Sequence, residues 1–359
     1  MRRPFFLFTL LSLFLFESPI AYSQEEAAEE ILNFMQKNPE KCAISLIHNQ
    51  ELIKTHRENE MMPLASTVKI MIALEFAYQT KEGNLKKEEE IPLSELDHFY
   101  VPNSDGGAHQ AWINSLALSD NESTVSLLEI AKGMMQFSSN ANSEYLLDRL
   151  GIEKVNQRIK ALNYENHEPI YYFVSALFIS QELLPDKENV DKKVSRLKKM
   201  SKIDYIEACR KIHYELKQDA AFSKSLKPLH IKLQESWSNR LPASTTSTYI
   251  DLMKKLNNKN HFPKAVQATM DQLMEGVMQS KANQKWLKHA GMKGGSTPMV
   301  LTKATYATDK DGDQTELVYF FNELDFLSNL NLQKKMNAFE LMILKDKRFR
   351  EKVKELKFD

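Results

Sequence analysis

Apolar residues recur along the chain in patterns that predict strands near both ends and helices between them. Residues 25–36 have the 3.6-residue period of an amphipathic helix. Two apolar runs follow at 42–48 and 51–57, and the turn formers between them predict a β-hairpin. Towards the other end of the chain, three more runs predict strands, at residues 291–296, 300–308 and 316–322.

The central part of the chain has a helical pattern instead. Residues 66–78 form an apolar segment without a polar face, which is typical of a fully buried helix. Residues 83–122 are rich in loop formers, whereas 124–137 and 141–150 predict two consecutive helices. Further helices are predicted after the capping stretch 242–246 and at residues 327–356.

Together these elements predict an α+β fold, in which an antiparallel sheet with flanking helices lies beside an all-helical lobe. Residues 24–65 and 245–359 would form the α/β lobe and residues 66–244 the helical lobe, with a cleft between them. Within the helical lobe, residues 186–240 carry fourteen basic and eight acidic side chains on a helical period. We interpret this segment as a solvated helical insertion, and a surface for an acidic partner is the alternative.

The first 23 residues have the pattern of a cleaved signal peptide. Arg2 and Arg3 precede an apolar stretch at residues 5–16, and a small-x-small cleavage site follows at 21–23. That apolar stretch is too short to cross a bilayer, which takes about 20 helical residues. We therefore expect a secreted or periplasmic protein that starts near Gln24 and has no membrane span after cleavage.

The net charge narrows the classes of partner, and the glycine content indicates where the backbone packs closely. The 48 basic and 48 acidic side chains cancel, which argues against a nucleic-acid-binding surface. Only ten of the 359 residues are glycine, well below the usual share of about 7%. Four of them form the pairs Gly106-Gly107 and Gly294-Gly295, where we expect the backbone to approach another group closely.

The sequence gives little support for metal or disulfide chemistry. Cys42 opens a strand-like apolar run and Cys209 lies in a charged helical stretch, so we expect two separate thiols, with a disulfide as the alternative. None of the nine histidines stands at an HxH or HExxH spacing. We expect no metal and no cofactor.

The buried segment at 66–78 begins with a Ser-x-x-Lys motif. Residues three apart share a helix face, so the Ser66 hydroxyl and the Lys69 amine can meet. Burial disfavours the charged amine and lowers its pKa, and a neutral amine beside a hydroxyl is a general base for a nucleophile. The same spacing recurs at Ser195 and Lys198, but that pair lies in the charged segment, where a solvated lysine stays protonated.

Two further motifs contain candidate polar groups. Ser138 and Asn140 lie at the junction of two predicted helices, where a hydroxyl can relay a proton and an amide can hold a substrate. We prefer this site to the similar triplet at 119–121, which reads as a turn. Lys293 opens a Lys-x-Gly motif in strand context, whereas the Lys-x-Gly triplets at 81–83 and 310–312 are typical of turns.

Each motif alone is common, but their order along the chain is not. The ordered set resembles that of the class A β-lactamase-type serine hydrolases, in the β-lactamase/penicillin-binding protein superfamily. The resemblance covers nearly all of the chain after residue 23, through residues 47–69, 123–151 and 292–308. It implies the β-lactamase/transpeptidase-like fold, a helical lobe beside a lobe with an antiparallel sheet.

The resemblance also implies a role for each motif residue. Ser66 would be the acylated nucleophile, Lys69 its base and Ser138 a proton shuttle to the leaving nitrogen. Lys293 would orient this shuttle and attract a substrate carboxylate. Substrate binding would involve Asn140, Gly295 and Ser296, with the backbone N–H groups of Ser66 and Ser296 forming the oxyanion hole. The implied substrate is a β-lactam or a peptidoglycan-like amide, bound by a monomer without a cofactor.

Departures from the family pattern leave the reaction open. Gly294 replaces the middle threonine of Lys-Thr-Gly, and no arginine occurs between Lys293 and Asn322. The E-x-x-L-N motif that supplies the deacylating glutamate is also missing, leaving Glu168 or Glu165 as candidates. The alternatives are therefore a D,D-peptidase or esterase, or a slowly deacylating penicillin-binding or peptidoglycan-sensing module. Trp112 is predicted to be buried packing, with a place lining the site as the alternative.

Overall fold

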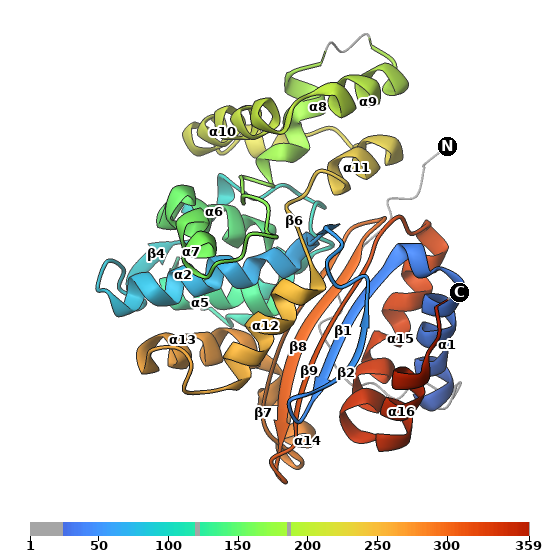
Figure 1. The fold of residues 1–359 in the computed structure, drawn as a ribbon. Coiled ribbons are helices and arrows are strands. Elements are labelled where there is room, and N and C mark those ends of the chain that lie inside the picture. Colours follow the sequence, from blue (N-terminus) through green and yellow to red (C-terminus); the bar gives the residue numbers. More distant parts are fainter. Residues whose placement is uncertain (1–23, 119–122, 185–187, 359) are drawn as a thin grey trace. The chain divides into compact units, whose positions relative to one another are not determined.

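The computed structural model describes residues 24–118, 123–184 and 188–358 (Figure 1). The expected signal peptide and the triplet at 119–121 lie outside these residues. The described chain divides into two compact units. One contains residues 68–164 and 169–242, and the other contains residues 24–67, 165–168 and 243–358. We call them the helical unit and the strand-bearing unit.

The strand-bearing unit is built on one antiparallel sheet with strand order β2-β1-β9-β8-β7. Strands from opposite ends of the chain meet at its centre, where Cys42 is opposite Phe321 and His48 is opposite Thr315. This pairing confirms the predicted α+β fold class. The five strands are β1 (Cys42–His48), β2 (Glu51–His56), β7 (Leu287–Ser296), β8 (Leu301–Asp309) and β9 (Gln314–Phe321).

Helices cover both faces of this sheet (Figure 1). Successive side chains of β9 point to opposite faces, so Tyr319 packs on Phe339 of α15 while Phe320 packs on Tyr249 of α12. Because both faces are covered, β9 is an almost unbroken run of buried residues. One face carries α1 (Gln24–Lys37), α15 (Phe326–Lys345) and α16 (Lys347–Glu355). The other carries α12 (Thr246–Asn257) and α13 (Lys264–Met274), with the short α14 (Lys281–Gln284) beside β7.

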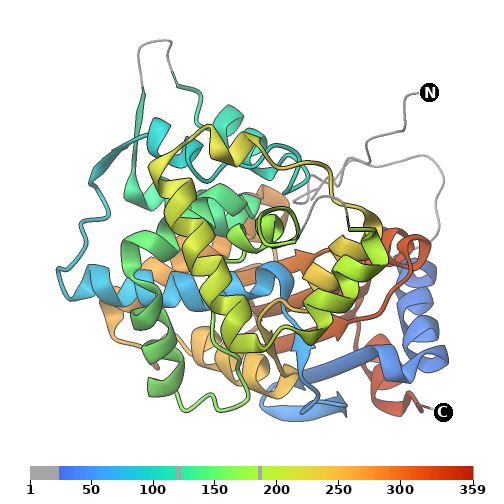
Figure 2. The same cartoon turned by 90° about the horizontal axis from the view of Figure 1, so that it is seen from above.

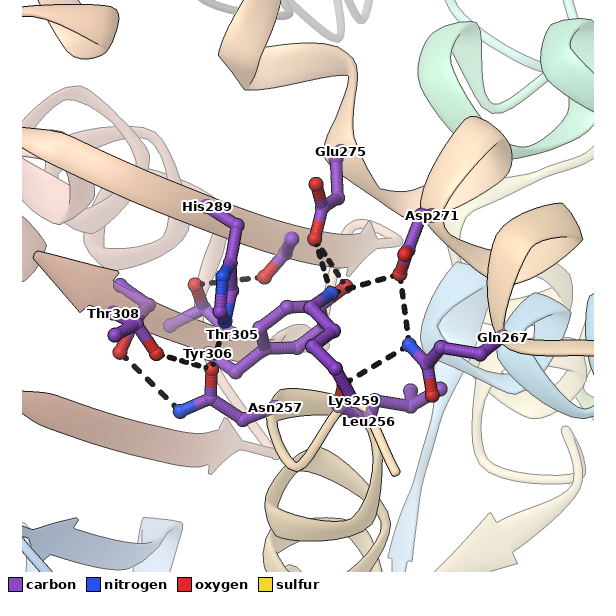
Figure 3. A network of polar contacts seen from close by, with 12 residues as sticks. Leu256, Asn257, Lys259, Gln267, Asp271, Glu275, His289, Thr305, Tyr306 and Thr308 are labelled. Atoms are coloured by element: carbon purple, nitrogen blue, oxygen red, sulfur yellow. Dashed lines mark hydrogen bonds and ion pairs between the residues drawn. The ribbon is translucent and has the colours of Figure 1, made fainter. Parts of the chain in front are cut away.

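A polar network ties the helices of the second face to the strands β7 and β8 (Figure 3). Lys259 Nζ donates to Asp271 Oδ1 at 2.7 Å and to Glu275 Oε1 at 2.5 Å, and the Tyr306 hydroxyl donates to the same Glu275 oxygen at 3.2 Å. Gly291 makes room for this tyrosine, because a Cβ there would lie 2.4 Å from its ring. The network therefore holds β8, which pairs with the strand that carries the predicted Lys-x-Gly motif.

The C-terminal helix predicted at 327–356 is in fact two helices. The backbone leaves the helical conformation at Asp346, whose carboxylate accepts the N–H groups of Arg348 and Phe349. The break turns α16 so that Phe349 and Val353 join the core under the sheet. The apolar spacing continues across this cap, so the periodicity could not show it.

The helical unit is centred on α2 (Lys69–Lys81), which packs on α6 (Asn140–Leu150) and α7 (Ile152–Ala161). Ten of the thirteen residues of α2 are buried, as its uniformly apolar sequence predicted. The predicted start at residue 66 is a 3₁₀ turn, Ala65–Val68, that leads directly into α2.

Two predictions for the helical unit were wrong in detail. Residues 124–137 are not one helix: β5 (Thr124–Ser126) pairs with β4 (Glu90–Pro92), and α5 (Leu127–Lys132) passes into a π-helical turn, Gly133–Phe137. The β-branched residues at 124 and 125 favour the strand, and the Ser126 side chain caps the helix. The loop-rich stretch 83–122 also contains α3 (Ser94–Asp97) and α4 (Ala108–Ser115).

The described part of the charged segment is mainly helical, with loops such as residues 225–230 between its helices (yellow-green in Figure 2). His213 of α10 lies between Glu144 Oε1 and Asp148 Oδ1 of α6, at 3.2 Å from each. Burial alone lowers the pKa of His213, but its hydrogen bonds to these carboxylates raise it overall. The helices of the segment are α9 (Val190–Lys199), α10 (Lys202–Gln218) and α11 (Ile231–Ser238), and the short α8 (Ile179–Glu182) precedes them.

The unit boundaries fall at 67/68 and 242/243, two residues from the predicted 65/66 and 244/245. The strand-bearing unit also includes 165–168, which the sequence did not assign to it. His167 forms a backbone bridge with Ser244 there, beside the short strand pair β3 (Met62–Pro63) and β6 (Ala243–Ser244).

Cys42 and Cys209 are both buried and free of disulfide bonds. Burial raises the pKa of the Cys42 thiol to about 12 and that of Cys209 well above its usual range. Both therefore stay protonated and are poor nucleophiles. Among the described residues, no helix is long and apolar enough to cross a membrane, and no cluster of side chains has the composition of a metal site.

Candidate active site

Lys69 lies at the start of α2 with its side chain completely buried. Its Nζ donates to the Ser138 carbonyl at 2.7 Å and to Asn140 Oδ1 at 3.0 Å, and it lies 3.3 Å from Ser138 Oγ. Burial lowers the pKa of the amine from 10.5 to about 7. A large fraction of Lys69 is thus neutral near pH 7, as a general base requires.

The backbone around Ser138 has an unusual conformation, which directs the Ser138 carbonyl and Asn140 Oδ1 towards Lys69. The π-helical turn Gly133–Phe137 ends at Ser138, which has a left-handed φ of 72°. Such turns and such conformations of a non-glycine residue are uncommon and are often found at functional sites. The next residue, Ser139, caps α6 by accepting the N–H of Asn142 at 3.3 Å. Asn140 is therefore the first residue of a firmly capped helix.

A second set of predicted residues comes together in the strand-bearing unit. Ser66 lies in the 3₁₀ turn Ala65–Val68, directly after Ala65, which has a left-handed φ of 44°. The end of β7 packs against this turn, since a Cβ on Gly295 would lie 2.4 Å from the Ser66 nitrogen. Thr302 strengthens the contact by donating from its Oγ1 to the Leu64 carbonyl at 2.8 Å. A residue with a side chain cannot replace Gly295 without moving the backbone of Ser66.

The two glycines of the pair Gly294-Gly295 differ in how much space a side chain would have. A Cβ on Gly294 would have its nearest neighbours at 3.5 Å, which is an ordinary contact. The expected close approach therefore occurs at Gly295 and not at Gly294. Lys293 is buried and donates to the Gly294 carbonyl at 3.0 Å, while Ser296 is the last residue of β7. All four residues follow one another on an edge strand of the sheet.

The predicted site residues thus form two local groups. Lys69, Ser138 and Asn140 contact one another in the helical unit. Ser66 and Gly295 contact each other in the strand-bearing unit, which also holds Lys293 and Ser296. The competing Ser195 and Lys198 are exposed on α9, where a lysine amine stays solvated.

The two candidate deacylation bases, Glu168 and Glu165, belong to neither of these two groups. Glu168 Oε2 accepts the N–H of Ala243 at 3.1 Å, and the Glu168 N–H donates to the Ala243 carbonyl at 2.9 Å. Its carboxylate therefore helps to join residues 165–168 to β6. Glu165 is exposed. A role for Glu168 in deacylation stays a prediction.

A cluster at the start of α6 was missed by the sequence reasoning. His109 Nδ1 lies 3.0 Å from Ser139 Oγ and 3.2 Å from Asn142 Oδ1, and Asp105 Oδ2 accepts the N–H of Asn140 at 3.3 Å. The sequence did contain a signal for this cluster, because Asp105 and His109 are four residues apart where α4 begins. Trp112, only 1% exposed, packs beside this cluster against Gly133, so it is buried packing as predicted.

Comparisons with known proteins give consistent results over most of the chain. A family model described as the β-lactamase enzyme family matches residues 26–317. A class A β-lactamase of Bacteroides cellulosilyticus is similar in structure, with 15% identity, a TM-score of 0.52 and coverage of 91% of this chain and 100% of that one.

Other solved structures show the same likeness. A β-lactamase of Sphaerobacter thermophilus has a TM-score of 0.55 at 14% identity, covering 89% of this chain and 95% of its own. A mutant of PBP-A, solved as an acyl-enzyme complex with penicillin G, has a TM-score of 0.52 at 14% identity, with coverage of 89% and 95%. No curated protein matches the chain in sequence. At these identities the structural matches establish the fold, which is the one implied by the motifs.

Proposed function

The chain belongs to the β-lactamase enzyme family, and we propose that it is an extracytoplasmic serine hydrolase that opens β-lactam amides through an acyl-enzyme on Ser66. The observation that carries the proposal concerns Lys69, the first residue of the helix that follows Ser66. Its buried amine donates hydrogen bonds to the Ser138 carbonyl and to Asn140 Oδ1. The signal-peptide pattern of residues 1–23 supports the location.

The proposed reaction begins when Ser66 Oγ attacks the lactam carbonyl carbon and transfers its proton to Lys69 Nζ. The carbonyl oxygen becomes an oxyanion, stabilised by the backbone N–H groups of Ser66 and Ser296. The carbon–nitrogen bond then breaks as Ser138 gives its proton to the leaving nitrogen and receives one from Lys69. The product is an ester on Ser66, and water releases the acid.

Several features support this sequence of steps. A lysine whose pKa is about 7 can both accept and return a proton near neutral pH. The contact between Gly295 and the Ser66 nitrogen brings the end of β7 beside that N–H group, as a shared oxyanion site requires. Lys293, three residues before Ser296 on the same strand, supplies positive charge for a substrate carboxylate.

Labelling with a fluorescent penicillin tests the nucleophile. We expect covalent labelling of the wild-type protein and of Ser195→Ala, and complete loss in Ser66→Ala. Ser195 is a matched control, because it belongs to the second Ser-x-x-Lys motif and is exposed on α9. Labelling that persists in Ser66→Ala, or that disappears in Ser195→Ala, would contradict the assignment.

A penicillin-binding role with slow deacylation is the second candidate, and one observation favours it. The Glu168 carboxylate is engaged with the backbone of Ala243, and the E-x-x-L-N motif is missing. If no other base serves, hydrolysis of the ester will lag behind its formation.

We accordingly expect a penicillin adduct on Ser66 that persists for minutes or longer, observed as a mass increase of the intact protein. The same time course for Glu168→Gln would exclude that residue as the base. Loss of the wild-type adduct within seconds would instead establish a competent β-lactamase, and the slow-deacylation candidate would be rejected.

A further inference from the structure

Asp105 lies where two helices of the helical unit begin. Its Oδ2 atom accepts the N–H of His109, in the first turn of α4, at 3.1 Å and the N–H of Asn140, the first residue of α6, at 3.3 Å. The N-terminus of a helix carries partial positive charge, and a carboxylate is a favourable partner there. Asp105 thus places a carboxylate at the start of both helices.

Asp105 and Lys69 both bind Asn140, through different groups of that residue. Asp105 binds the backbone N–H of Asn140, while Lys69 Nζ donates to the Asn140 side-chain Oδ1 at 3.0 Å. The second carboxylate oxygen of Asp105, Oδ1, is buried and has no hydrogen-bond partner in the part of the chain that the structure describes. This oxygen leaves part of the Asp105 charge uncompensated, and that charge acts on the Lys69 amine.

The other titratable groups near Lys69 carry little net charge. Burial lowers the pKa of His109 and raises that of Tyr100, so both are neutral at pH 7. On α2 and α6, Glu75 is paired with Arg158 at 2.8 Å and Glu144 with His213 at 3.2 Å. Among the described residues of the helical unit, Asp105 is thus the charge that acts on Lys69. Burial lowers the pKa of this lysine, and Asp105 opposes that effect.

We propose that Asp105 is a positioning residue of the acylation step, which anchors Asn140 and supplies the negative charge that balances the Lys69 amine. This inference rests on the proposed acylation of Ser66. A fully buried lysine without a counter-charge is a weak base, and proton transfer slows as the base weakens. Asp105 therefore keeps Lys69 basic enough to take the proton of Ser66.

The decisive variant is Asp105→Asn, which keeps a hydrogen-bond acceptor for both helix starts and removes the charge. Asp105→Ser, also a good capping residue, is the second variant in case the first does not fold. Glu95→Gln is the matched control, because Glu95 is an exposed carboxylate that accepts the hydroxyl of Tyr145 on α6 at 3.1 Å and does not contact Lys69.

Two measurements are made on the full-length protein. The first is the titration of Lys69, followed through the ¹³Cε signal that disappears in Lys69→Met. We expect its midpoint to fall by about one pH unit in Asp105→Asn and to stay in place in Glu95→Gln. The second is the pH profile of penicillin labelling. Its acid limb should shift downwards by the same amount in Asp105→Asn, with a maximum rate several-fold below wild type.

The outcomes separate this inference from the proposed function. An unchanged Lys69 midpoint in both Asp105 variants overturns the inference, even if labelling of Ser66 is normal. Conversely, a wild-type protein that penicillin does not label refutes the proposed function, and the Lys69 titration still decides the role of the charge. A loss of thermal stability without a shift in midpoint would show Asp105 to be a helix cap alone.

Discussion

Lys69→Met is expected to slow acylation by penicillin about 10³-fold at pH 7, within the range that general-base catalysis contributes. Methionine fills similar space without the amine, so Ser66 loses its proton acceptor while α2 stays packed. Removal of the amine takes one donor away from the Ser138 carbonyl and from Asn140 Oδ1, but it also ends the cost of burying a lysine. These effects oppose each other, and we expect a Tm close to that of wild type.

The wild-type pH profile provides the second half of this test. Because burial lowers the pKa of Lys69 to about 7, the labelling rate should fall below pH 7, as the amine becomes protonated, and be level above it. Lys198→Met serves as the control, since its amine is exposed. Wild-type labelling by Lys69→Met, or a rate that is unaffected by pH between 5 and 8, would exclude Lys69 as the base.

Gly295→Ala is expected to reduce acylation about 100-fold or more. The added Cβ would lie 2.4 Å from the Ser66 nitrogen and 2.9 Å from the Leu64 carbonyl oxygen, both backbone atoms that cannot turn away. The strand and the turn must therefore separate, and a displacement of about 1 Å at a reacting group is enough for such a loss. The kinetics of penicillin labelling measure the effect directly.

The neighbouring glycine is the natural control for this substitution. Gly294→Ala places its Cβ 3.5 Å from the nearest atoms, so we expect labelling within a few-fold of wild type and little change in Tm. Equal behaviour of the two variants would show that the contact between β7 and the Ser66 turn does not determine the reaction.

The sequence predicted the elements whose patterns are local and regular. The apolar run after Ser66 correctly indicated a buried helix, and the short apolar runs at both ends correctly indicated one antiparallel sheet. The close approach expected at both glycine pairs was correct at Gly295. It was wrong at Gly107, where a Cβ would have nothing within 4 Å and the left-handed φ of 84° accounts for the glycine. These signals depend on a few neighbouring residues and need no knowledge of the tertiary structure.

Other features depend on contacts between distant residues and gave no such signal. The cap at Asp346 interrupts a continuous apolar period, and the π-helical turn before Ser138 begins at Gly133, where Trp112 and Asn142 pack closely. Asp105 reaches Asn140 across 35 positions in sequence. A spacing rule cannot find such a pair.

The helix pair formed by α6 and α10 limits how this protein can be shortened. The charged segment looks dispensable by its composition, and a minimal enzyme would be designed without it. Yet His213 supplies the partner for Glu144, whose buried carboxylate also accepts the N–H groups of Val174 and Ser175. Deletion would remove a hydrogen-bond partner of that buried carboxylate, which lies on the helix that begins at Asn140. The segment therefore supports the helix that carries Asn140, and a shortened design must replace Glu144 as well.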